Sequence, residues 1–194
     1  MPRLMAPFVA STLALAILPA VAEDAPDHDA MMAAWTKAMT PGPEHQALAT
    51  LGGAWKMTTT YWLDPSAPPE VSEGRAERRM ILGGRVLEEQ VEGQMMGDTF
   101  QGIAQTGYDN VTGRYWATWT DDMSTGITLL YGRDDPASGQ MVFEGETSDP
   151  MTGGQSPMRI ESRMEGEDRE VSNFFMPGPD GQMAKTMQIV YERQ

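Results

Sequence analysis

The chain has 194 residues, a formal net charge of -14 and no cysteine. The acidic balance disfavours nucleic acid and anionic lipid surfaces as partners, because both attract clustered lysine and arginine side chains. Without cysteine there are no disulfides and no thiol chemistry, so a single domain of this length depends on its hydrophobic core for stability.

The first 22 residues have the order of a secretory signal peptide. Arg3 precedes an apolar run from Met5 to Ala20, and Ala20-Val21-Ala22 has the small-x-small pattern of a cleavage site. The apolar run contains two prolines and is short for a membrane-spanning helix. We therefore expect cleavage near Ala22, a periplasmic or secreted protein, and no membrane contact after cleavage.

The remaining chain divides into residues 23–41, an acidic leader with a short helix, and residues 42–194, the main domain. Apolar residues recur at helical spacings of three and four in the leader, at Met31, Met32, Trp35, Ala38 and Met39. Pro41 ends this helix. A second short helix is predicted to begin at Pro43 and to end before Gly52-Gly53, since proline favours the first turn and glycine the position after the last.

After Trp55 the pattern changes to short strands separated by turn residues such as Gly83-Gly84 and Asp109 to Gly113. The predicted strands are Trp55–Trp62, Ser72–Leu82, Arg85–Met96, Thr99–Tyr108, Arg114–Thr120, Ile127–Arg133, Gln140–Thr147, Pro157–Met164, Arg169–Met176 and Met183–Arg193. Turns this short leave no room for parallel crossovers. We expect an all-β fold, an antiparallel up-and-down barrel of about ten strands preceded by short helices, with a two-sheet sandwich as the alternative.

A barrel of this size has an interior wide enough for one small apolar ligand, positioned by a few polar groups. Alternation along the strands gives six candidates to line that interior: Arg79, Glu89, Tyr108, Tyr115, Trp119 and Tyr131. The inward face of the strand with Arg79 is ambiguous, because Met80 and Leu82 alternate with Arg79 and Ile81. These six side chains could equally fill the interior and pair with one another, for example Arg79 with Glu89.

Two sets of motifs carry a resemblance. Gly53-Ala54-Trp55 at the start of the first strand and Arg193 at the end of the last resemble the Gly-x-Trp start and closing arginine of lipocalin-like (calycin) barrels. That resemblance implies that Arg193 packs over Trp55 at the barrel base, a cation–π contact. A longer series of segments resembles the bacterial domain-of-unknown-function family 1579 (DUF1579) over about residues 42 to 193, a family expected to be calycin-like and without an assigned activity. The segments are Gly42-Pro43-Glu44-His45, Leu51 to Trp55, Asp64 to Pro69, Leu82 to Arg85, Met95-Met96-Gly97, Gly107 to Asn110, Asp149 to Gly153 and Lys185-Thr186-Met187.

Familiar catalytic and cofactor chemistries find little support. No histidine follows His45, which is expected to be a solvated or capping residue, and the late strands therefore lack the usual histidine ligand of haem. The 17 methionines suit core packing better than copper, because Met-x-Met and Met-x-x-Met runs are missing and adjacent methionines on a strand point to opposite faces. We predict no catalytic residue, no metal ligand and no cofactor.

The favoured function is therefore the binding of a small hydrophobic or amphipathic ligand in the barrel. One alternative is an enzyme acting on such a ligand, with Glu89 or Asp121 as the base. The other is a structural or interaction protein whose barrel is filled by its own side chains. The oligomeric state is left open by the sequence.

Overall fold

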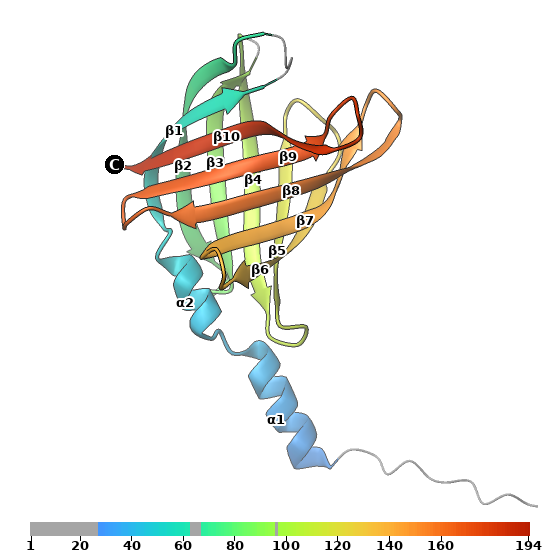
Figure 1. Cartoon of the computed structure of the whole chain (residues 1–194). Coiled ribbons are helices and arrows are strands. Elements are labelled where there is room, and N and C mark those ends of the chain that lie inside the picture. The colour runs from blue at the N-terminus through green and yellow to red at the C-terminus, as the bar shows by residue number, and fades with distance from the viewer. Residues whose placement is uncertain (1–26, 63–66, 96) are drawn as a thin grey trace, which may run out of the picture.

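The computed structural model describes residues 27–62, 67–95 and 97–194, and it contains two helices and ten strands (Figure 1). The predicted signal peptide, its cleavage site and the beginning of the acidic leader lie outside the described residues. The elements are α1 (His28–Met39), α2 (Pro43–Ala49), β1 (Gly53–Tyr61), β2 (Glu70–Ile81), β3 (Val86–Met95), β4 (Asp98–Asp109), β5 (Arg114–Asp121), β6 (Thr128–Asp135), β7 (Gln140–Asp149), β8 (Gly154–Met164), β9 (Arg169–Pro177) and β10 (Met183–Arg193).

The ten strands form a closed antiparallel barrel in which each strand pairs with its sequence neighbours. Closure is made between the first and last strands, with Trp55 opposite Arg193 and Tyr61 opposite Met187. The prediction of an up-and-down barrel of about ten strands is confirmed, and the two-sheet alternative is wrong. Closure removes the two exposed edges that an open sheet of this length would present.

Three of the hairpins use the same turn chemistry, an aspartate followed four residues later by a glycine with positive φ. In each turn the aspartate carboxylate accepts hydrogen bonds from the backbone N–H two residues on and from a Ser or Thr hydroxyl three residues on. The turns are Asp109–Gly113, Asp135–Gly139 and Asp149–Gly153. These hydrogen bonds lower the pKa of all three aspartates, so the turns are held by charged acceptors.

Strand β8 begins earlier than predicted and contains Pro157. The proline is tolerated because β8 pairs only with β7 at that point, with Pro157 opposite Glu146. Pairing of β8 with β9 begins two residues later, at Arg159. A proline that lacks an N–H therefore occupies a position where one side of the strand is unpaired.

Helix α2 covers one end of the barrel, here called the lower end, where it contacts β2, β3 and β4 (Figure 1). Helix α1 extends beyond this end and buries none of its residues. The expectation that methionines pack in a core is therefore wrong for Met31, Met32 and Met39, which are 40%, 47% and 54% exposed. Neither helix in the described part of the chain is long and apolar enough to cross a membrane.

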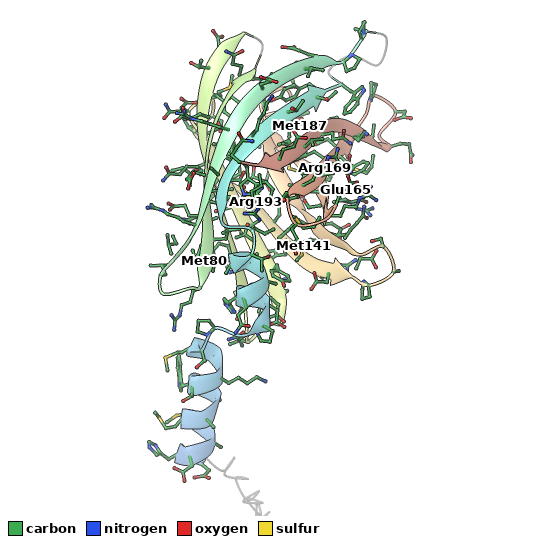
Figure 2. The ribbon with its side chains drawn as sticks, turned by 90° about the vertical axis from the view of Figure 1, so that its left-hand side faces the viewer. Met80, Met141, Glu165, Arg169, Met187 and Arg193 are labelled. Carbon is green, nitrogen blue, oxygen red and sulfur yellow. The ribbon has the colours of Figure 1, made fainter. Side chains whose placement is uncertain are left out.

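The interior contains two clusters of apolar side chains. The lower cluster joins Leu48 of α2 to Leu87, Tyr115, Leu130 and Phe143. The second cluster is built around the buried ring of Trp55, and it comprises Trp55, Met57, Ala76, Val91, Ile189 and Tyr191. Figure 2 shows Met80 and Met141 in the lower half of the barrel and Met187 in the upper half.

Candidate functional site

The alternation of buried and exposed positions decides which predicted residues face the interior. Glu89 lies between the buried side chains of Leu87 and Val91 on the inner face of β3. Tyr115 is buried in the lower cluster, and Tyr108 packs against that cluster at its edge. Trp119 packs against the second cluster. These four residues therefore occupy the interior side of the barrel wall, as the sequence predicts.

The prediction that Arg79 faces the interior is wrong. Its side chain is 64% exposed on the outer face of β2, where it forms an ion pair of 2.8 Å with Glu88. The arginine that enters the barrel is the preceding residue, Arg78, which is only 4% exposed. Alternation alone could not choose between two adjacent arginines, because apolar residues follow both of them in phase.

Tyr131 is also placed wrongly by the sequence prediction. It is 42% exposed on the outer face of β6, and the guanidinium of Arg114 stacks over its ring at 3.7 Å. The inner face of β6 carries Leu130 and Gly132 instead. The ring of Phe143 occupies the space above Gly132, where a Cβ would lie 2.5 Å from the ring. A residue with a side chain would therefore clash at this position. A prediction that assigns the inner face by the number of large apolar residues fails for a strand whose inner face includes a glycine.

A buried ion cluster crosses the interior between three strands, and the sequence analysis did not identify it as a unit. The Arg78 guanidinium lies 2.5 Å from an Oε of Glu170 and 3.2 Å from an Oε of Glu89. Glu170 also accepts a hydrogen bond from the Ser172 hydroxyl at 3.1 Å, and Ser172 shares a 2.7 Å hydrogen bond with Ser162. One arginine therefore faces two carboxylates in a region shielded from water.

With both carboxylates ionised, this cluster would carry an excess of negative charge. Burial raises the pKa of Glu89, the nearby Glu170 raises it further, and Arg78 opposes both effects. A protonated Glu89 leaves one positive and one negative charge in the cluster, which removes the need to bury a net charge. Burial also raises the pKa of the Tyr191 phenol, whose ring lies 4.2 Å from the Arg78 guanidinium carbon.

Two polar atoms of the cluster have no hydrogen-bond partner, Nε of Arg78 and Oε1 of Glu89. Nε lies within ion-pair distance of Glu89, at 3.2 Å, but does not donate a hydrogen bond to it. Buried polar atoms without a partner are uncommon and destabilising. They leave hydrogen-bonding capacity in the barrel interior.

The lower end of the barrel is closed by stacked side chains, as the lipocalin-like resemblance implies. Arg193 stacks over Trp55 at 4.2 Å and donates hydrogen bonds to the carbonyls of Gly52 and Thr50 at 2.6 and 2.9 Å. Arg78 lies over the same ring from the interior, at 5.1 Å. Trp55 itself is 1% exposed and donates its indole N–H to the Leu51 carbonyl. The predicted structural roles of Trp55 and Arg193 agree with these contacts.

His45 belongs to this closure and has a capping role. Its Nδ1 accepts a hydrogen bond of 3.1 Å from the Gly42 backbone N–H at the start of α2. Its ring is buried and meets Tyr108 edge to face at 6.0 Å, and Tyr108 meets Tyr115 at 4.9 Å. Burial raises the pKa of Tyr115 to about 12, so this phenol is neutral.

At the upper end, four apolar side chains that face the interior remain partly exposed. We call them the upper inner residues, and they are Phe100, Trp119, Phe174 and Met187. Phe100 and Trp119 lie flat against the wall over Gly93 and Gly102, where a Cβ would lie 2.7 and 2.2 Å from their rings. Glycine on the inner face therefore allows these two large rings to line the wall.

The wall itself is split near the upper end. The ladder between β2 and β3 stops at the pair Arg75–Glu92, although β2 stays paired with β1 as far as Glu70 and β3 with β4 as far as Met95. An open depression of about 380 Å³ lies at this split, lined by Gly74, Gly93 and Phe100 together with polar residues of the three strands. A second depression of about 360 Å³ lies around Tyr131 on the outer face.

The adjacent carboxylates of Asp121, at the end of β5, and Asp122, in the loop that follows, have structural partners. Asp121 accepts hydrogen bonds from the Trp119 indole N–H at 2.6 Å and from the Met123 backbone N–H at 3.1 Å. Asp122 accepts one from the Gln101 backbone N–H at 3.0 Å. Among the described residues, no group of three or more His, Asp or Glu side chains is arranged to hold a metal ion.

Comparisons with known proteins support the fold and leave the activity unnamed. No curated protein matches the chain. A crystal structure of Rv2717c from M. tuberculosis is similar with a TM-score of 0.59 and 15% identity, covering 80% of this chain and 99% of that one. A redesigned β-barrel shares 12% identity with a TM-score of 0.38, over 76% of this chain and 95% of the other. The model of the family described as "Protein of unknown function (DUF1579)" matches residues 40–193, so the chain belongs to this family.

Proposed function

We propose that this protein is exported and binds a small hydrophobic or amphipathic molecule at the upper end of its barrel. The observation that carries the proposal is the partial exposure of the upper inner residues, which face the interior but are only partly covered by the protein itself. Interior-facing aromatic rings in a water-accessible position gain free energy when an apolar molecule covers them. Inner side chains of the lower cluster such as Met80 and Met141 are also partly exposed, but α2 covers that end of the barrel.

The polar groups beneath these rings favour an amphipathic ligand. The upper inner residues pack against the second cluster, whose members include Val91, Ile189 and Tyr191. The cluster of Arg78, Glu89 and Glu170 belongs to the same region of the barrel, and Oε1 of Glu89 has no partner. A ligand with an apolar body and one polar group would match this order of apolar and polar surface.

An enzymatic function has less support. The Asp121 carboxylate, one of the two bases considered, is already held by the Trp119 indole and a backbone N–H. The pKa of Glu89 is raised, as for many general acids and bases, but this residue lies between the buried Leu87 and Val91 and is paired with Arg78. Binding therefore remains the better-supported function for this arrangement.

Titration with the fluorescent probe N-phenyl-1-naphthylamine tests the binding proposal. We expect saturable binding of one probe per chain, displaced by a fatty acid such as palmitate. Phe174→Ala, which removes one upper inner ring, is expected to weaken binding about tenfold, since a lost aromatic contact is worth about 1.4 kcal/mol. Tyr131→Ala, which removes a similar ring from the outer face, is the matched control and should bind like the wild type.

Two outcomes would overturn the proposal. One is a probe signal that never saturates. The other is an equal loss of affinity in the Phe174 and Tyr131 variants, which would place the probe on the outer face. Thermal unfolding of both variants distinguishes a lost contact from a lost fold.

A further inference from the structure

Helix α1 presents soft metal-binding side chains that no other part of the described chain covers. Met31 and Met32 are 40% and 47% exposed, and the helix has no buried residue. Figure 2 shows sulfur atoms on this helix standing clear of the barrel. Packing, which accounts for the methionines of the barrel interior, gives no reason for methionine at these two positions.

The helical geometry gathers three potential ligands on one side of α1. Successive residues of an α-helix turn by about 100°, so residues at i, i+3 and i+4 lie on one face and one turn apart. His28, Met31 and Met32 have this spacing. His28 lies one turn before the two methionines, and its angle about the helix axis falls between their angles. Trp35 lies on the same helix face, four residues after Met31 and three residues after Met32.

We propose that His28, Met31 and Met32 form a binding site for a soft monovalent cation, Cu(I) or Ag(I). Thioether sulfur selects soft ions, and an imidazole nitrogen is a good third ligand for copper. Harder ions such as Ca²⁺ or Mg²⁺ take carboxylate oxygens, and none of the three proposed ligands is a carboxylate. The Trp35 ring adds a cation–π contact to the bound ion.

Two contacts from the barrel hold the helix that carries this site. Asn110 in the β4–β5 turn donates to the carbonyls of Lys37 and Thr40, at 3.0 and 2.8 Å. Arg85 in the β2–β3 turn donates to the Met39 carbonyl at 2.5 Å. Both contacts satisfy carbonyls at the C-terminal end, where a helix otherwise lacks partners. The N-terminal half with its three ligands extends away from the barrel and is accessible to an ion.

The chain offers a close control for the two ligand methionines. Met39 lies on the same helix face and is 54% exposed, but it is three helical turns from His28 and outside ligand reach. Replacing a methionine by leucine keeps size, hydrophobicity and helix propensity while removing the sulfur. Comparison of the Met31→Leu/Met32→Leu double variant with Met39→Leu therefore isolates the thioether ligands.

The experiment is a titration of the full chain with Ag(I), followed by Trp fluorescence, and a competition for Cu(I) against bathocuproine disulfonate under anaerobic ascorbate. We expect one ion per chain and quenching of part of the Trp signal. The double methionine variant and His28→Ala should each weaken Cu(I) binding at least tenfold, and Met39→Leu less than twofold. Trp35→Phe should abolish most of the quenching while it retains the stoichiometry.

Equal affinities in the wild type and the double methionine variant would overturn the proposal, as would the absence of a stoichiometric ion. Loss of binding in Met39→Leu comparable to the loss in the double variant would also overturn it. Far-UV circular dichroism of each variant checks that α1 and the barrel are retained.

Discussion

The two ends of the barrel are built from the same strands but treat their interior side chains in opposite ways. At the lower end, Trp55 is enclosed between Arg78 and Arg193, and α2 covers what remains. At the upper end, Trp119 and its apolar neighbours face inward and stay partly exposed. The lower end therefore has a cover of its own in α2 and Arg193, whereas the partly exposed inner side chains of the upper end keep apolar surface in contact with water.

The largest expected effect comes from the ion cluster between the two ends. Arg78→Met removes the positive charge that faces Glu89 and Glu170, and we expect a loss of about 3–5 kcal/mol in unfolding free energy. Urea unfolding measures this loss. The triple variant R78M/E89Q/E170Q should recover a large part of it, because no buried charge is left unpaired.

Arg79→Ala is the control for this prediction. Its ion pair with Glu88 lies on the exposed outer face, and we expect a change of at most about 1 kcal/mol. An equal loss in the Arg78 and Arg79 variants would contradict the assignment of Arg78 to the interior.

A direct comparison of the two ends uses their tryptophans. Trp55→Ala should lower the unfolding free energy by about 3–5 kcal/mol, because it leaves a large hole in a fully packed region. The loss of unfolding free energy in Trp119→Ala should be smaller by at least about 1 kcal/mol, because the Trp119 ring is already partly hydrated. If both variants lose the same stability, the two ends do not differ in packing.

A smaller effect is expected from the arginine that covers the base. Arg193→Ala removes the stacking on Trp55 and the hydrogen bonds to Gly52 and Thr50, with an expected loss of about 1–3 kcal/mol. Arg193→Lys keeps the charge but loses the planar fork, and we expect it to recover less than half of that loss. Thermal unfolding monitored by near-UV circular dichroism, which reports the Trp55 environment, measures both variants.

The smallest effect is a pH dependence with opposite signs for two adjacent glutamates. Burial raises the pKa of Glu89 above its ordinary value, so the stabilisation by its proton is complete below pH 4.5 and is lost as pH rises through the folded pKa. Glu89→Gln should therefore gain stability relative to the wild type between pH 5 and 8.

The outer residue Glu88 is the matched control. The hydrogen bond from Arg79 lowers the pKa of Glu88, so its contribution is present above the ordinary pKa and lost as pH falls. The stability of Glu88→Gln relative to the wild type should not increase as pH rises. Parallel urea titrations at several pH values check both signs, and equal slopes for the two variants would contradict the inward position of Glu89.

Much of the fold is encoded locally. The alternation of apolar and polar residues marks all ten strands, and the Asp-to-Gly turns fix three hairpins through their own hydrogen bonds. The Gly53-Ala54-Trp55 start and Arg193 identify the base because both belong to short motifs with a fixed position relative to the strands. Inward positions for Glu89, Tyr115 and Trp119 also follow from alternation, because their neighbours in phase are apolar.

The outer position of Arg79 and Tyr131 and the exposure of α1 required the tertiary structure. A period of two determines which residues share a face, but it does not determine which face closes inward when both carry apolar side chains. Barrel closure decided that Arg78 meets Glu89 and Glu170, which lie on strands far apart in sequence. The amphipathic pattern of α1 likewise cannot show whether its apolar face is covered, because covering depends on where the helix lies relative to the barrel. The sequence by itself therefore determined the strands, their turns and the base of the barrel, and only the packed structure decided which charges and which methionines are buried.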